Sequence, residues 1–183
     1  MHHRGVPQLL VVHHSPTAAT RQLTDAVVAG CRDDVVHEDL PPGTEVEVRV
    51  LEALAFARGE ADHHDLLAAD GYLLGTTANF GYMSGALKHV FDSTFLHVGG
   101  ALDDDGAPAG GDGPGGATAR RPYGLYLHGR YDLTGAVRSV QSVTGALGWR
   151  QAFEVVGVVG ETTEADRARA HELGATIAAL LTG

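Results

Sequence analysis

Residues 8–20 read QLLVVHHSPTAAT, and this stretch decides the fold class. Its apolar centre, 9–12, is bounded by Pro7 and by a Ser-Pro-Thr turn, which is typical of a short strand buried on both faces of a sheet. The following residues, 18–31, carry apolar side chains at helical spacing. The stretch therefore predicts a buried strand, a tight turn rich in hydroxyl groups, and a helix.

The same alternation continues along the chain. Further strands are predicted at 45–51, 71–75, 122–128 and 153–159, and further helices at 62–69, 84–95, 133–147 and from Thr163 onward. Five strands, each followed by a helix, indicate an α/β fold with a parallel sheet and helices on both faces. Ligands of such sheets bind beyond the carboxyl ends of the strands, so the strand-to-helix loops form the candidate site.

The length of 183 residues fits a single domain spanning residues 1–183. Hydrophobic residues make up 44% of the chain and charged residues 20%, which is a globular balance. Residues 99–119 interrupt the alternation and are rich in Gly, Pro and Asp. This composition predicts a solvated loop insertion that contributes nothing to the core.

Charge and cysteine content exclude several classes of function. The chain has 13 basic and 23 acidic residues, a formal net charge of -10, which argues against binding to nucleic acid or to an anionic membrane. Its start lacks the pattern of a signal peptide, and a cytoplasmic protein is expected. Cys31 is the single cysteine, so an internal disulfide and a cysteine-pair zinc site are excluded; we expect it to be a buried residue in the middle of the first helix.

The loop at 14–20 places three hydroxyl side chains where a helix begins. Free N–H groups and the helix dipole make such a place an anion site, but the same residues also suit an ordinary helix N-cap, and the loop alone supports both interpretations equally. It is neither a P-loop nor a dinucleotide fingerprint, because the chain has no Gly-Lys-Ser/Thr and no Gly-x-Gly-x-x-Gly after a strand.

Two further loops follow the third and fourth predicted strands. In the loop at 75–85, Phe80 and Tyr82 could wall a flat aromatic ligand, or they could pack on the sheet within a long turn. The loop at 128–132 supplies an imidazole, a guanidinium and a phenol, or it serves only as a helix cap through Asp132.

Two of these segments carry a family resemblance. The run 15–20, Ser-Pro-Thr-Ala-Ala-Thr, resembles the flavodoxin phosphate motif Ser-x-Thr-Gly-x-Thr. The run 81–88, Gly-Tyr-Met-Ser-Gly-Ala-Leu-Lys, resembles the signature Gly-x-Met-Ser-Gly-x-Leu-Lys of NAD(P)H-dependent FMN and quinone reductases. The chain thus resembles the flavodoxin-like superfamily, nearest to these reductases. The resemblance implies a doubly wound, five-stranded parallel sheet with strand order 2-1-3-4-5.

The resemblance also implies an FMN site built from the three loops. It assigns the phosphate to Ser15, Thr17, Ala18, Ala19 and Thr20; one side of the isoalloxazine to Thr77, Ala78, Asn79, Phe80, Gly81 and Tyr82; and its other side to His128, Gly129, Arg130, Tyr131 and Asp132. Ala18 stands where the family has glycine, and an alanine at positive φ would cost about 1 kcal/mol.

The implied activity is hydride transfer from NAD(P)H through FMN to a small-molecule acceptor, a quinone or a flavin. Arg130 is the candidate for offsetting negative charge at the ring or for gripping a nicotinamide phosphate, and His128 for donating a proton or a hydrogen bond. One alternative is a flavodoxin-type electron carrier between proteins, which the acidic charge suits, and another is a scaffold that has lost FMN. A homodimer is compatible with all three.

Other site chemistries find less support. The chain has 11 histidines, but His13 and His14 are neighbours on a strand and point to opposite faces, and no His-Glu-x-x-His occurs, so no metal site is expected. Ser84 lacks the glycine two residues earlier that a nucleophile elbow needs, so a serine hydrolase is not expected.

Overall fold

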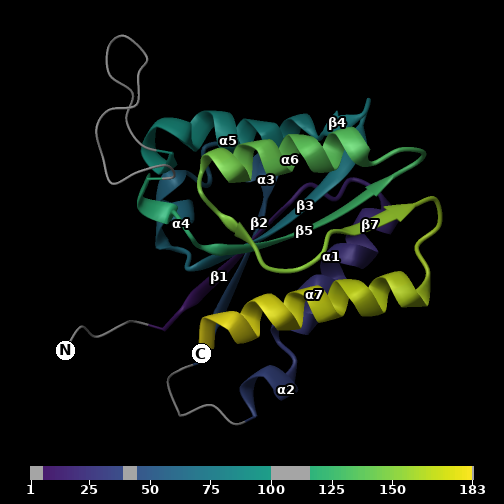
Figure 1. Cartoon of the computed structure of the whole chain (residues 1–183), viewed down its shortest axis with the longest axis horizontal. Coiled ribbons are helices and arrows are strands. Elements are labelled where there is room, and N and C mark those ends of the chain that lie inside the picture. Colours follow the sequence, from purple (N-terminus) through teal and green to yellow (C-terminus); the bar gives the residue numbers. More distant parts are fainter. Residues whose placement is uncertain (1–5, 39–44, 100–115, 183) are drawn as a thin grey trace.

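The computed structural model describes residues 6–38, 45–99 and 116–182 (Figure 1). Helices and strands alternate along these segments. In chain order they are β1 (Gln8–His13), α1 (Ala18–Cys31), α2 (Asp34–His37), β2 (Glu47–Glu52), α3 (Ala53–Ala57), α4 (His63–Ala68), β3 (Gly71–Asn79), β4 (Tyr82–Met83), α5 (Gly85–Val98), the 3₁₀ helix η1 (Gly116–Thr118), β5 (Pro122–Gly129), α6 (Thr134–Ala146), β6 (Arg150–Gln151), β7 (Val156–Val159) and α7 (Glu164–Thr182).

The sheet confirms the predicted strand order. Strands run in the order β2-β1-β3-β5, all parallel, and β6 and β7 both pair with β5 on its far side. The sheet has seven strands rather than five, because the last edge position is split into β6 and β7 and because β4 pairs antiparallel with the end of β3. The five predicted strand positions are all present, and the first lies between the second and the third.

Helices cover both faces of the sheet, with α1 and α7 on one face and α5 and α6 on the other (Figure 1). The apolar run of β1 serves both layers: Leu9 and Val11 join the core beneath α1 and α7, while Leu10 and Val12 join the core on the α5 side. Because successive side chains of a strand point to opposite faces, a central strand with two cores has no polar positions in its middle.

Helices α1 and α7 pack so closely that the backbone of each contacts the backbone of the other. A Cβ added at Gly30 of α1 would overlap the carbonyl oxygen of His171, and one added at Gly174 of α7 would overlap the carbonyl oxygen of Val27. Two glycines, one from each helix, therefore fix the spacing of this layer.

Several element boundaries differ from the prediction. Strand β3 continues past Gly75 to Asn79, because Thr76 and Thr77 keep their parallel register with β5. The fifth predicted strand begins only at Val156, and α2 and α3 were not predicted at all. Cys31 is the last residue of α1, not a mid-helix residue, although it is buried as expected.

The predicted insertion at 99–119 is only partly described, since residues 100–115 lie outside the described segments. Its last part contradicts the idea of a solvated loop. The η1 helix ends at Thr118, which is fully buried and accepts a hydrogen bond of 2.9 Å from Nε1 of Trp149. The C-terminal end of this segment therefore packs on the core.

None of the helices within 6–38, 45–99 and 116–182 combines the length and the apolar character needed to cross a membrane.

Candidate functional site

Parallel pairing brings the predicted loops to one edge of the sheet. Strands β1, β3, β5 and β7 all end there, with Thr77 opposite His128 and His128 opposite Val158. In Figure 1 this is the edge where β4 and the tip of β7 lie. The loops also touch: a Cβ at Gly135 in the first turn of α6 would overlap the carbonyl oxygen of Gly81.

The hydroxyl groups of the first loop cap helix α1. Thr17 is the N-cap, and its Oγ1 accepts a hydrogen bond of 3.2 Å from the Thr20 N–H. In return, the Thr17 N–H donates to Thr20 Oγ1 at 3.2 Å. The N-cap interpretation is confirmed. The backbone N–H groups of Ala18 and Ala19 belong to the first helical turn and have no carbonyl partner within the helix, so they remain available to bind an anion.

The expectation that Ala18 is strained is wrong. Ala18 is the first residue of α1, and among the described non-glycine residues only Phe80 and Arg120 have positive φ. The alanine found in place of the family's glycine therefore fits a helical conformation and carries no penalty at this position.

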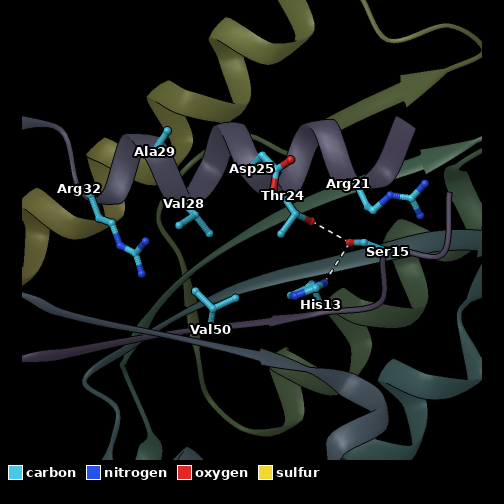
Figure 2. Close-up of a pocket in the computed structure, with 9 residues that line it drawn as sticks. All are labelled: His13, Ser15, Arg21, Thr24, Asp25, Val28, Ala29, Arg32 and Val50. Atoms are coloured by element: carbon cyan, nitrogen blue, oxygen red, sulfur yellow. Dashed lines mark hydrogen bonds between the residues drawn. The ribbon is translucent and has the colours of Figure 1, made fainter. Parts of the chain in front are cut away.

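A chain of hydrogen bonds leads from this loop into the core, and Figure 2 shows the links from His13 to Ser15 and from Ser15 to Thr24. His13 Nδ1 lies 3.0 Å from Ser15 Oγ, which lies 2.7 Å from Thr24 Oγ1, which in turn lies 2.9 Å from the hydroxyl of Tyr126. Burial lowers the pKa of His13, and it raises the pKa of Tyr126. Ser15 is thus held between the half-buried His13 and the buried Thr24. Thr24 and Tyr126 were not predicted; the hydroxyl of Thr24 in the buried stripe of α1 was the available signal.

A groove of about 480 Å³ runs along the flank of α1 beside β2 (Figure 2). Its lining consists of His13, Ser15, Arg21, Thr24, Asp25, Val28, Ala29, Arg32 and Val50. Of the predicted site residues only Ser15 belongs to it. The predicted ring residues do not line this groove; they follow β3 and β5.

The second loop exposes its aromatic side chains. Phe80 has φ 51° and a fully exposed ring, and Tyr82 is also exposed, as is Tyr131 of the third loop. The alternative in which these aromatics pack on the sheet is therefore wrong for Phe80. A bulky residue at positive φ is a costly arrangement, and exposed rings gathered at one edge suit contact with a flat apolar ligand.

Several residues of the signature at 81–88 hold this loop in place through hydrogen bonds to neighbouring elements. The Met83 N–H donates to Ser139 Oγ at 3.1 Å, and the Ser84 N–H donates to Thr76 Oγ1 at 3.0 Å. Ser84 Oγ accepts from the Leu87 N–H and caps α5. Ser84 is fully buried, in agreement with its exclusion as a nucleophile.

In the third loop, His128 and Asp132 have defined partners. His128 Nε2 donates to the Gly160 carbonyl at 2.6 Å; because a carbonyl only accepts, the ring proton is on Nε2 and Nδ1 remains available. Asp132 accepts from both the N–H and the hydroxyl of Thr134, and these bonds lower the pKa of the carboxyl. Leu133, not Asp132, is the N-cap of α6, so Asp132 holds the first helical residue, Thr134, from the position before the cap.

The other residues of this loop divide between surface and interior. The Arg130 guanidinium lies 5.4 Å from the centre of the exposed Tyr131 ring, a cation–π arrangement. Gly129 is buried, and a Cβ there would press on the side chains of Leu133 and Ala78. Its missing side chain therefore makes room for packing.

Buried polar atoms without partners gather at this edge. Within the described segments, four buried side-chain atoms have no hydrogen-bond partner, and three of them are His14 Nδ1, Thr77 Oγ1 and Thr162 Oγ1. His14 follows β1, Thr77 lies near the end of β3, and Thr162 follows β7. The fourth atom belongs to Gln8, at the other end of β1. A buried polar group left unpaired costs about 1–3 kcal/mol, so these atoms are candidates to bind polar atoms of a ligand at this edge. His14 and Thr162 were not predicted.

Comparison with known proteins shows which fold this architecture shares. No family model matches the chain. A flavodoxin of Aquifex aeolicus is 29% identical over 96 residues, which are 52% of this chain and 44% of that flavodoxin, so the match spans less than half of the relative. The structure of an archaeal flavodoxin superposes with a TM-score of 0.68 at 13% identity, covering 96% of this chain and 99% of the other. The chain has a flavodoxin-like fold.

A second solved structure extends the comparison. An azoreductase of Bacillus anthracis has a TM-score of 0.59 at 17% identity, with 97% of this chain and 99% of that chain covered. On this flavodoxin-like fold, the residues at the carboxyl edge fit a phosphorylated aromatic ligand: a helix N-terminus with open N–H groups, exposed aromatic rings, and buried hydroxyl and imidazole groups that lack partners.

Proposed function

We propose that this chain binds FMN at the carboxyl edge of its sheet and transfers reducing equivalents from NAD(P)H to a small-molecule acceptor, a quinone or a flavin. The observation that carries the proposal is the set of unpaired buried atoms in His14, Thr77 and Thr162 at that edge. The flavodoxin and the azoreductase among the similar proteins support a flavin-dependent role.

The phosphate is assigned to the start of α1. Ala18 and Ala19 offer N–H groups in the first turn, and the hydroxyl of Thr17, an exposed residue, lies beside them. With no lysine in the loop, the binding energy comes from neutral donors and the helix dipole. Thr20 acts indirectly, because its buried hydroxyl bonds to the backbone of Thr17 and so shapes the turn.

The ring is assigned to the loops after β3 and β5. Phe80, Tyr82 and Tyr131 supply exposed aromatic surface, and the Thr77 hydroxyl supplies a polar group that needs a partner. FMN, when bound, supplies the hydride and electron chemistry that no side chain of the site can perform. Arg130 adds a positive charge above Tyr131, and His128 is fixed with Nδ1 free to accept a hydrogen bond.

The test is anaerobic reduction of the FMN-loaded protein by NADH and by NADPH. We expect at least one of them to bleach the visible flavin absorption, and a quinone added next to restore it. Arg130→Ala should slow the bleaching about 10-fold or more while FMN stays bound, since a charge-assisted contact contributes about 1.5–3 kcal/mol. Arg130→Lys, which keeps the charge, is the matched control.

A flavodoxin-type carrier is the second candidate. The net charge of -10 and the match to a flavodoxin favour it, because an acidic surface assists docking on basic partner proteins. If neither nicotinamide bleaches the bound flavin within minutes while dithionite does so at once, the reductase proposal is wrong and the carrier replaces it.

A further inference from the structure

A cluster of histidines lies far from the candidate flavin site. His63 and His64 open helix α4 behind the N-cap Asp62, and His97 lies in the last turn of α5. Helix α5 begins next to β4 and spans about 20 Å at 1.5 Å per residue, so its C-terminal turn lies at the opposite end of the sheet (Figure 1).

Three side chains of this cluster converge on one point. One ligand atom from each of Asp62, His63 and His64 lies within 4.8 Å of the other two. His64 Nδ1 and Asp62 Oδ1 are 3.1 Å apart and hydrogen-bonded to each other. Two ligands bound at about 2.0–2.1 Å to a tetrahedral ion are separated by about 3.3 Å, so an ion could replace the shared proton with little movement of either side chain.

The turn before α4 explains why neighbouring residues can converge here. Asp62 has extended backbone angles and folds its carboxylate back over the first turn, where it accepts the His64 N–H at 2.8 Å. Adjacent histidines on a strand would diverge, whereas these two rings, with centroids 4.1 Å apart, face the same carboxylate.

His97 holds the ring of His63 in place. The two imidazoles are stacked with centroids 3.8 Å apart and planes inclined by 16°.

We propose that Asp62, His63 and His64 bind one divalent first-row transition-metal ion, with His97 as a positioning residue that orients His63. Two imidazoles and one carboxylate suit Zn²⁺ or Cu²⁺ and not Mg²⁺ or Ca²⁺, which take oxygen ligands. Three protein ligands leave one position of a tetrahedral ion open to water. None of these four residues takes part in the proposed flavin chemistry, so the metal site does not depend on that proposal.

The chain provides a matched control. His171 Nε2 and Asp33 Oδ2 are also 3.1 Å apart, but within the described part of the chain only the Asp62 cluster brings three such ligands together. A two-ligand pair should hold Zn²⁺ far more weakly than a three-ligand site.

The experiment is calorimetric titration of the untagged full chain with ZnCl₂, with and without FMN. We expect one site of defined stoichiometry whose affinity is the same in both forms. His63→Ala and His64→Ala should each weaken it about 10-fold or more, while His171→Ala leaves it unchanged. Asp62→Asn should also weaken it, although asparagine keeps the N-cap and hence the fold.

His97 is tested by a pair of variants. His97→Phe retains a stacked ring without a ligand nitrogen and should keep the Zn²⁺ affinity, whereas His97→Ala should lower it several-fold. Equal loss in both variants would overturn the positioning role. Absence of a saturable site, or equal weakening by His63→Ala and His171→Ala, would overturn the metal site itself, and neither outcome affects the FMN proposal.

Discussion

Replacing Gly30 with alanine is expected to lower the free energy of unfolding by about 3 kcal/mol, the upper part of the usual range for overpacking. The new methyl group would meet the carbonyl oxygen of His171, which belongs to the rigid backbone of α7 and cannot rotate away. Gly174→Ala should have a similar effect, because its methyl group would meet the carbonyl oxygen of Val27 in α1.

The matched control is Gly145→Ala in helix α6. A Cβ at Gly145 has no neighbouring atom within 4 Å, so the substitution should stabilise the helix by roughly 0.5–1 kcal/mol. Urea or thermal unfolding measures all three variants, and Gly30→Ala should lower the Tm by roughly 10 °C. A Gly30→Ala protein as stable as the wild type would show that α1 and α7 do not pack this closely.

Thr17→Asp is expected to weaken FMN binding about 1000-fold while riboflavin binds as before. Aspartate is as good an N-cap as threonine, so α1 should keep its start. Its carboxylate would, however, stand beside the FMN phosphate; two like charges about 4 Å apart repel by roughly 4 kcal/mol at an effective dielectric constant of 20. Riboflavin has no phosphate and does not experience this repulsion.

Flavin fluorescence during titration of the apo-protein measures both affinities. Thr17→Ser retains the hydroxyl and the cap and serves as the control, with affinities close to those of the wild type. If Thr17→Asp loses FMN and riboflavin equally, the substitution acts through the fold. If it loses neither, the phosphate does not lie at the start of α1.

The layout of the sheet could be predicted because burial on two faces leaves a strong pattern. The run at 9–12 is apolar throughout since both sides of β1 are covered. Helix α3 was missed because Ala53–Ala57 follows β2 directly, with no turn residue between them. The end of β3 was missed because Thr76 and Thr77 are small and polar, and only their register with β5 keeps them in the strand.

The sequence predicted which loops form the candidate site, but not the contacts that their residues make. Parallel topology alone brings the loops at 14–20, 75–85 and 128–132 to one edge. The bond between Thr24 and Tyr126 joins residues 102 positions apart, and the unpaired atoms of His14 and Thr162 depend on how the loops pack. A single sequence holds no pattern for such contacts. Likewise, His97 meets His63 only because α5 ends beside α4.

Amide chemical-shift mapping of the ¹⁵N-labelled apo-protein with FMN tests the location of the FMN site most directly. We expect saturable shifts confined to 14–20, 77–82, 128–132 and 160–162, the backbone at the carboxyl edge of the sheet. Shifts confined to the groove flank, at Val28, Arg32 and Val50, would move the ligand to the side of α1. The absence of any saturable shift would show that the chain does not bind FMN.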